Sequence, residues 1–272
     1  MTGRTAVTWF SGKSAIVTGA ARGIGRATAE LLSELGAFVV AVDKDEDALR
    51  ALAATEGCIS WVGDLAGDDV EHMAENIWQR HGPIHLLVNN AGIDSPQRFL
   101  DLDEPDFDRV FRTNLRGPWF FTRRIARRMV GAELGGAIVF VSSLHDRTIR
   151  MLPHYSASKA AVSMLVKELA NELAPHGIRV NAVSPGRIRT ERLSRSARGD
   201  ERLAHLVPLG RPGEPVEVAR MIAVLLSEEW SGYVTGTNVS VDGGLGLHSW
   251  SQDEHRDDPA GAFRRLRRRW RR

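Results

Sequence analysis

The sequence predicts an α/β fold in which one parallel sheet of about seven strands is covered by helices on both faces. Short apolar runs alternate with longer stretches of helical periodicity. This alternation is typical of strands that are buried on both faces of a parallel sheet. The chain of 272 residues, 43% of them apolar, is also long enough to bury one sizeable core. We therefore expect a single doubly wound domain.

The expected elements follow one another in a regular order. Strands are expected at Ala15–Thr18, Phe38–Val42, Ile59–Val62, Leu86–Asn89, Ala137–Val141, Ile178–Val183 and Asn238–Val241. Helices are expected between them, near residues 24–35, 45–54, 67–80, 105–130, 155–174 and 215–227. Crossovers in such sheets are right-handed, and ligands bind beyond the carboxyl ends of the strands, where the strand order reverses. A site is therefore expected at the strand ends.

A glycine-rich segment directly follows the first expected strand and opens a helix. It reads Thr18-Gly19-Ala20-Ala21-Arg22-Gly23-Ile24-Gly25. One glycine permits the tight turn, another lets a pyrophosphate approach backbone N–H groups, and the last permits close helix–strand packing. The helix N-terminus favours the anion. The residues expected to hold a dinucleotide here are Thr18, Gly19, Arg22, Gly23, Ile24 and Gly25.

Asp43 ends the second expected strand, 24 residues after Gly19. A carboxylate at this place can accept hydrogen bonds from both ribose hydroxyls and repels a 2′-phosphate, which favours NAD over NADP. Arg22 and Lys44 argue the other way, because either could pair with that phosphate. NAD(H) is the expected cofactor, and NADP(H) stays open.

Tyr155 and Lys159 form the most informative pair in the chain. They lie in a stretch with few helix breakers, and a spacing of four puts both side chains on one helix face. A free phenol titrates near ~10 and is a poor base at neutral pH. An ammonium beside it favours the phenolate and lowers that pKa. The pair is therefore a candidate proton-transfer device.

Further motifs stand between these two sites, in order: Asp64-Leu65, Asn89-Asn90-Ala91-Gly92, Asn114, Ser143 and, downstream, Pro185-Gly186. Together with the glycine-rich turn and the Tyr-x-x-x-Lys pair, they resemble the short-chain dehydrogenase/reductase family from about Ser11 to Gly244. The resemblance implies a single Rossmann-like domain with strand order 3-2-1-4-5-6-7. It also implies an NAD(P)-dependent enzyme that interconverts a secondary alcohol and a ketone, with a 3-oxoacyl-thioester reductase of the same fold as the alternative.

The resemblance also implies roles for individual residues. Those on the adenosine side of the cofactor would be Asp64, Leu65, Asn90, Ala91 and Gly92. Those on the nicotinamide side would be Tyr155, Lys159, Pro185, Gly186, Ile188 and Thr190. Tyr155 would exchange the substrate proton, Ser143 would hydrogen-bond the substrate oxygen, and Asn114 would hold a water in a proton relay. Lys159 and the positive nicotinamide ring would lower the pKa of the phenol.

Two serines end the fifth expected strand, and they give different alignments with the family. Ser142 lies thirteen residues before Tyr155, the usual gap, whereas Ser143 lies twelve before it. The alternation of the strand puts the second serine at the catalytic place, and the loop that follows would then be one residue short. We therefore expect Ser143 to be the catalytic serine.

Several expectations concern partners and location. No run of about 18 apolar residues exists, so no membrane span is expected. The first twelve residues do not read as a secretory signal, so a cytoplasmic protein is expected. The single cysteine, Cys58, excludes an internal disulfide and a multi-cysteine metal site, and no metal is expected. The resemblance implies a homo-oligomer, most plainly a homotetramer, paired through helices 105–130 and 155–174. Apolar residues offered for that contact are Phe111, Trp119, Phe120 and Met164.

The ends of the chain and one loop differ in composition from the rest. We expect an N-terminal extension at 1–10, the catalytic domain at 11–244, a mobile substrate loop at 191–213 and an Arg-rich tail at 245–272. The tail carries eight Arg and four acids, with a stripe of Phe263, Leu266 and Trp270. It could bind nucleic acid or membranes, but contact with the protein's own body or with a neighbouring subunit is the preferred hypothesis. No nucleic-acid or membrane partner is therefore expected. A cofactor-binding regulator is the third alternative, and it fits poorly because Ser143, Tyr155 and Lys159 are all present.

Overall fold

The computed structural model contains one sheet of seven parallel strands in the order β3-β2-β1-β4-β5-β6-β7, which confirms the predicted fold. The strands are β1 (Ser14–Thr18), β2 (Phe38–Asp43), β3 (Cys58–Val62), β4 (Leu86–Asn89), β5 (Gly136–Val141), β6 (Ile178–Pro185) and β7 (Asn238–Val241). The structure describes residues 8–52, 55–148, 151–190 and 206–247. The strand order reverses between β1 and β4, which makes their carboxyl ends the expected ligand site.

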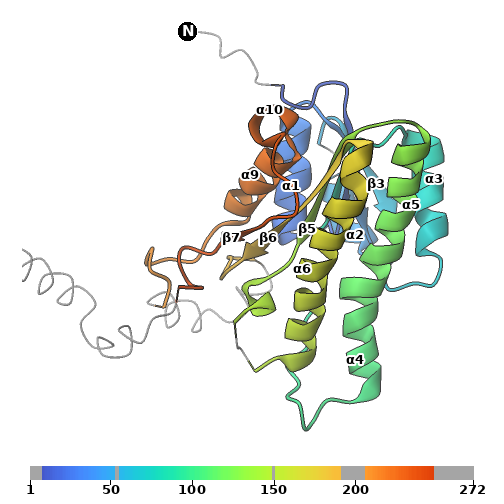
Figure 1. Cartoon of the computed structure of the whole chain (residues 1–272). Coiled ribbons are helices and arrows are strands. Elements are labelled where there is room, and N and C mark those ends of the chain that lie inside the picture. Colours follow the sequence, from blue (N-terminus) through green and yellow to red (C-terminus); the bar gives the residue numbers. More distant parts are fainter. Residues whose placement is uncertain (1–7, 53–54, 149–150, 191–205, 248–272) are drawn as a thin grey trace, which may run out of the picture.

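Helices cover both faces of the sheet (Figure 1). They are α1 (Gly23–Glu34), α2 (Glu46–Leu52), α3 (Val70–His81), α4 (Glu104–Phe111), α5 (Gly117–Gly131), α6 (Pro153–Leu173), α9 (Pro215–Leu226) and the short α10 (Glu228–Ser231). Three short turns of other helical types are η1 (Arg112–Arg116), η2 (Leu144–Asp146) and η3 (Ala174–His176). Helices α1, α2 and α9 bury their apolar sides on one face of the sheet, and α3, α5 and α6 on the other.

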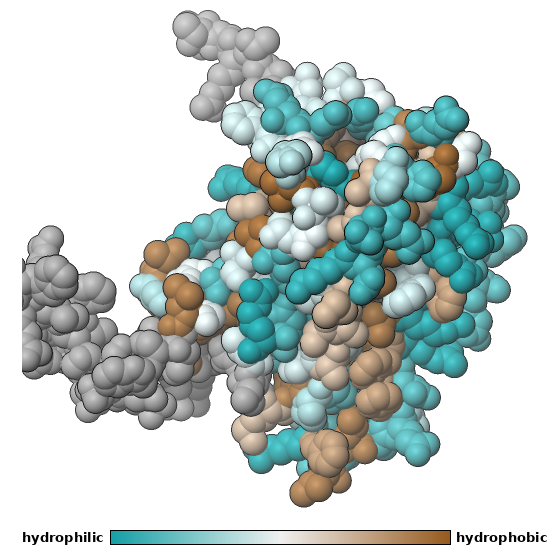
Figure 2. All heavy atoms as spheres, in the orientation of Figure 1, coloured by the Kyte–Doolittle hydropathy of each residue, from teal (hydrophilic) through white to brown (hydrophobic). Residues whose placement is uncertain are grey.

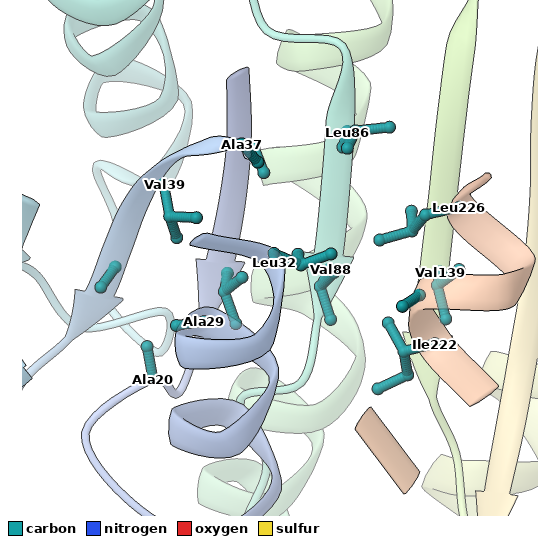
Figure 3. Packing of buried hydrophobic residues seen from close by; sticks show 14 of the residues in the cluster. Ala20, Ala29, Leu32, Ala37, Val39, Leu86, Val88, Val139, Ile222 and Leu226 are labelled. Carbon is teal, nitrogen blue, oxygen red and sulfur yellow. The ribbon is translucent and has the colours of Figure 1, made fainter. Parts of the chain in front are cut away.

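The two faces of the sheet contribute to separate hydrophobic clusters, because successive strand residues point to opposite sides. In β1, Val17 belongs to the cluster under α1 and α9, whereas Ile16 belongs to the cluster under α3, α5 and α6. Figure 3 shows the first cluster, in which helix residues meet strand residues: Ala29, Leu32, Ile222 and Leu226 against Val39, Val88 and Val139. This two-sided burial explains why the strands read as nearly continuous apolar runs.

The long helix expected at 105–130 is broken in the structure. Helix α4 ends at Phe111, η1 is a π-helical turn, and α5 starts at Gly117, whose N–H donates to the carbonyl of Arg112, five residues back. Pro118 explains part of the break, since it has no N–H to donate to the carbonyl of Asn114. Gly117 is also constrained, because a Cβ there would lie 1.9 Å from the carbonyl oxygen of Leu65. Such π turns are frequent at functional sites.

Two residues that the sequence assigns to an N-terminal extension pack on the domain. Phe10 is buried in the cluster under α1, and Trp9 stacks on Trp230 of α10 with ring centroids 5.5 Å apart. The folded part of the chain therefore includes Trp9 and Phe10. Residues 1–7 of that extension, most of the loop expected at 191–213 and nearly all of the tail lie outside the described residues.

No helix in the described part of the chain combines the length and the apolar character that crossing a membrane requires.

Candidate functional site

A cleft of about 630 Å³ opens at the carboxyl ends of the strands, at the reversal between β1 and β4. It brings together nearly all the residues that the sequence proposes for a dinucleotide. These lining residues are Gly19, Arg22, Gly23, Ile24, Asp43, Asp64, Leu65, Asn90, Ala91, Gly92, Tyr155, Lys159, Pro185, Gly186, Ile188 and Thr190. Thr18 and Gly25 do not line it. They lie behind it and shape the turn.

The glycine-rich turn leaves no room for side chains at its centre. Gly19 has a φ of +66°, and a Cβ at Gly25 would lie 2.0 Å from the carbonyl oxygen of Gly19. Residue Arg22 precedes α1 without a side-chain cap, and the first turn of α1 holds no acidic residue. The first N–H groups of α1 therefore have no anionic side chain beside them, and the lining fits the pyrophosphate of a dinucleotide.

Thr18 and Asn90 fix the turn against the neighbouring strand. The Thr18 hydroxyl accepts the N–H groups of Asn90 at 3.1 Å and Ala91 at 3.2 Å. The Asn90 amide donates to the carbonyls of Thr18 at 3.1 Å and Gly19 at 2.9 Å. Both polar side chains are thus used in joining the ends of β1 and β4. Their part in the site is to hold the backbone in place.

Charged residues surround Asp43 at the end of β2. The two oxygens of Asp43 accept backbone N–H groups, from Ala21 at 3.1 Å and from Asp45 at 3.0 Å. Arg22 pairs with Asp45. Lys44 lies with its Nζ 3.7 Å from Asp64 Oδ2. Each of the two cations that could accept a 2′-phosphate therefore already faces a carboxylate.

Helix α6 carries the tyrosine and the lysine into the cleft. The Nζ of Lys159 donates to the carbonyl of Val141 at 2.9 Å and lies 5.8 Å from the ring centroid of Tyr155. Burial lowers the pKa of Lys159 from 10.5 to about 8, and the charge of Asp146 offsets part of that change. Burial raises the pKa of Tyr155, a hydrogen bond with Ser143 lowers it in part, and Asp146 raises it.

The expected lowering of the phenol's pKa is therefore not met by the protein groups alone. Taking the phenolate out of water costs more than its neighbours in the protein return. The other group expected to lower the pKa of Tyr155 is the positively charged nicotinamide ring of the bound cofactor.

The two serines after β5 have different surroundings. The Ser142 hydroxyl points to α6, where it donates to the carbonyl of Lys159 at 3.2 Å and lies 3.0 Å from Ser163 Oγ. The Ser143 hydroxyl accepts the N–H of His145 at 3.3 Å, and it lies close enough to the Tyr155 phenol to lower the pKa of that group in part. The strand alternation thus gives the two hydroxyls different neighbours, and only Ser143 is beside the phenol.

Asn114 lies on the π turn and is buried. Its side chain exchanges hydrogen bonds with the backbone of Ile93, both at 2.8 Å, and donates to Ser158 Oγ at 3.0 Å. Ser158 in turn donates to the carbonyl of Tyr155 at 2.7 Å. The amide of Asn114 therefore joins the loop after β4 to α6. No motif or spacing in the sequence marks Ser158 as part of the site.

A smaller cavity of about 210 Å³ adjoins the cleft and shares its reactive corner. Its lining is Asp94, Ser143, Leu144, His145, Tyr155, Pro185, Gly186, Arg187, Leu206 and Leu245. The His145 ring meets the Tyr155 ring edge-on at 5.1 Å. Arg187 lines this cavity, whereas Arg147 and Arg189 pair with Asp146 and Glu214.

Asp146 is the polar residue near the site that the sequence analysis missed. Its carboxylate is buried and receives hydrogen bonds from Arg147, Ser163 and Asn238. An acid beside an arginine in a loop resembles an ordinary surface pair, so no role is predicted for this residue from the sequence. A carboxylate three residues after two strand-end serines was the available signal.

Comparisons with known proteins cover almost the whole described chain. The family model described as Enoyl-(Acyl carrier protein) reductase matches residues 19–246. The 3-oxoacyl-[acyl-carrier-protein] reductase FabG of Thermotoga maritima is 40% identical over 248 residues, which are 87% of this chain and 98% of that protein. L-rhamnose 1-dehydrogenase (NAD(P)(+)) of Azotobacter vinelandii is also 40% identical over 248 residues, 86% of this chain and 96% of the relative. A crystal structure of a short-chain type dehydrogenase/reductase from Mycobacterium marinum has a TM-score of 0.82 at 38% identity and covers 88% of this chain and 97% of that one.

Proposed function

The chain belongs to the short-chain dehydrogenase/reductase family and is an NAD(P)-dependent oxidoreductase of alcohols and ketones, and we propose that Tyr155 is its general acid and base. One observation carries this proposal: Ser143 and Tyr155 line both the dinucleotide cleft and the smaller cavity. A substrate in the smaller cavity would thus place its oxygen beside two hydroxyl groups, next to the bound cofactor.

The proposed proton chemistry follows from these contacts. When bound in the cleft, the nicotinamide accepts or donates the hydride. In the oxidation direction, Tyr155 as phenolate takes the proton of the substrate hydroxyl, while Ser143 donates a hydrogen bond to the same oxygen. The ammonium of Lys159 favours the phenolate by its charge. Reduction reverses each step.

A route for the proton beyond Lys159 is also part of the proposal. The side chain of Asn114 is already bonded to Ile93 and Ser158. A water held by Asn114 would therefore use its main-chain carbonyl, to which Pro118 cannot donate. The π turn that carries Asn114 fits this role, because such turns are frequent at functional sites.

We propose NAD(H) as the preferred cofactor. Around the adenosine ribose, the cations Arg22 and Lys44 face the carboxylates Asp43, Asp45 and Asp64, and two positive and three negative charges leave a net charge of −1. A 2′-phosphate would bring a further negative charge into this group. The salt bridges are exposed and individually weak, so the net charge is the stronger part of the support.

A compact, polar alcohol and its ketone are the proposed substrate class. In the described part of the chain, the smaller cavity measures about 210 Å³, and Asp94, His145 and Arg187 bring polar groups to its wall. Ligand pockets for larger molecules span roughly 300–1,000 Å³ and are mainly apolar. A 3-oxoacyl thioester is the alternative substrate, and one of the relatives is named for that chemistry.

An absorbance assay for NADH tests the proposed function. The panel holds polyols, sugars, simple secondary alcohols, their ketones and 3-oxoacyl thioesters, each with NAD(H) and NADP(H). We expect the highest kcat/KM for a polar alcohol with NAD, and a kcat lower by ~10²–10⁴-fold for the Tyr155→Phe control. Turnover confined to thioesters with NADPH would favour the alternative, and no turnover on the whole panel would refute the proposal.

We also propose a homo-oligomer, most simply a tetramer, in the cytoplasm, where a soluble dinucleotide pool supplies such an enzyme. Figure 2 shows hydrophobic surface gathered over α4 and α6. On this side, Phe107, Trp119 and Met164 are exposed by 40%, 45% and 55%. Exposed apolar patches of this kind mark subunit contacts. Light scattering at micromolar concentration would give the mass of several chains, and a monomer mass would refute this part.

A further inference from the structure

A buried carboxylate connects four elements behind the reactive corner. Asp146 ends η2, and its side chain is only 3% exposed. Its Oδ2 accepts from Ser163 of α6 at 2.6 Å and from Asn238 of β7 at 2.7 Å, and it lies 3.1 Å from Ser184 Oγ of β6. Arg147 donates to Oδ1 at 2.7 Å. A buried charge with this many donors fixes the relative positions of the elements that supply them.

The elements joined in this way carry the reactive groups. The N–H of Asp146 donates to the carbonyl of Ser143 at 3.0 Å, so the carboxylate and the serine share one short turn. Ser163 lies one helical turn beyond Lys159 on α6, and its hydroxyl reaches both Asp146 and Ser142. Ser142 continues the chain of contacts to the carbonyl of Lys159 at 3.2 Å. The carboxylate therefore ties the Ser143 turn to the helix of Tyr155.

Asp146 also brings a negative charge to the site. Burial raises its pKa, but hydrogen bonds from Arg147 and Ser163 outweigh that effect and hold the pKa below its ordinary value. The group is therefore an anion at neutral pH. The charged and titratable groups that interact with it are Arg147, Tyr155 and Lys159. Asp242 acts on Arg147 in turn, and His145, the preceding residue, packs on the ring of Tyr155. Asn would fill the same space without the charge, so the charge itself can be tested.

We propose that Asp146 is a positioning residue: it fixes the Ser143 turn against the helix of Tyr155 and Lys159, and its negative charge sets the electrostatic balance of that pair. The inference rests on the proposed function of Tyr155. An anion nearby opposes loss of a proton from either group. Removing the charge therefore eases phenolate formation, whereas removing the partner cation Arg147 makes it harder.

The chain offers a direct optical measurement. It contains only two tyrosines, Tyr155 and Tyr233, and Tyr233 is fully exposed. Tyr233→Phe should therefore leave fold and activity unchanged and make Tyr155 the single tyrosine. The ultraviolet absorbance of tyrosinate then follows the phenolate of Tyr155 without any turnover, and circular dichroism at each pH shows that the protein stays folded.

In this background we expect Asp146→Asn to lower the titration midpoint of Tyr155 by at least about 0.5 pH. Arg147→Gln should raise it, and this variant decides the sign even if Asp146→Asn does not fold. Ser163→Ala is the matched control, because it cuts the tether and keeps the charge, so its midpoint should stay within ~0.2 pH of the parent. Both Asp146→Asn and Ser163→Ala should lower kcat for alcohol oxidation about 10-fold to 10²-fold.

Each outcome decides one part. Midpoints that move in neither Asp146→Asn nor Arg147→Gln, or that move in the same direction in both, overturn the electrostatic role. An unchanged kcat in Asp146→Asn and Ser163→Ala overturns the positioning role. A parent protein without turnover on the substrate panel refutes the proposed function instead, and the tyrosinate titration still decides the charge effect.

Discussion

Replacing the two adjacent serines separately should divide catalysis from stability. Ser143→Ala removes the hydroxyl beside Tyr155. Among the described residues, that hydroxyl has one hydrogen bond with the backbone, from the N–H of His145 at 3.3 Å. Little else depends on that hydroxyl, so we expect the free energy of unfolding to fall by less than ~1 kcal/mol. Loss of one preorganised donor at the reacting oxygen should lower kcat by about 10²–10³-fold.

Ser142→Ala should have the opposite profile. Its hydroxyl donates to the carbonyl of Lys159 at 3.2 Å and contacts Ser163 Oγ at 3.0 Å, and it is buried with both partners. The one hydroxyl proton makes one buried hydrogen bond, so its loss together with the contact to Ser163 should lower the unfolding free energy by roughly 0.5–1.5 kcal/mol. The kcat should fall less than in Ser143→Ala, because the effect reaches Tyr155 only through α6.

The assay pairs urea unfolding with NADH absorbance kinetics on the same preparations. The result that refutes the reasoning is a larger kcat loss for Ser142→Ala with a larger stability loss for Ser143→Ala. That outcome would make Ser142, which lies thirteen residues before Tyr155, the catalytic serine.

Four further predictions address other parts of the site. Tyr155→Phe should lower kcat by ~10²–10⁴-fold with the dissociation constant for NADH nearly unchanged, as measured by fluorescence titration. Asp43→Ala should raise the kcat/KM ratio of NADP to NAD; a wild-type enzyme that already prefers NADP would contradict the NAD assignment. The pKa of Lys159 is about 8 in the folded protein, below its ordinary 10.5, so between these pH values the unfolded state binds more protons and the folded state becomes more stable as pH rises. Urea unfolding of the wild type, compared with Lys159→Met at each pH, should show this gain as at most about 3 kcal/mol of unfolding free energy. Gly117→Ala should lower the unfolding free energy by ~3 kcal/mol, because its Cβ would meet the Leu65 carbonyl. The control Gly131→Ala, whose Cβ would have no atom within 4 Å, should raise the unfolding free energy by roughly 0.5–1 kcal/mol. Thermal unfolding measures both, and equal effects would contradict the contact at Gly117.

The order of strands and helices could be predicted because each element is long enough to show its own periodicity. The runs at β2 and β5 are buried on both faces, and continuous apolar runs separated by helical patterns have few other interpretations. Strand ends then locate the ligand site without further information. Boundaries moved by one to three residues, as for α3, which begins at Val70 where 67 was expected.

The features that the sequence did not predict depend on contacts between distant residues. Pro118 is a local sign of the break, but the constraint on Gly117 comes from Leu65, more than fifty positions earlier. Asp146 is similar, because its partners Ser163 and Asn238 come from α6 and β7. The raised pKa of Tyr155 is a matter of burial, which spacing on a helix cannot reveal.

The π turn has a geometric consequence for how the chain tolerates insertions and deletions. An α-helix turns by about 100° per residue, so the one extra residue in η1 rotates α5 by that angle relative to a continuous helix from α4. With this rotation, α5 presents Arg123 and Arg128 to Glu71 and Glu75 of α3. Deleting one residue between α4 and α5 would therefore displace Asn114 and turn these arginines away from α3 in the same step. A deletion or insertion at this point therefore affects both the position of Asn114 and the contact of α5 with α3. Only an insertion that compensates a deletion, or the reverse, within the same few residues would restore both.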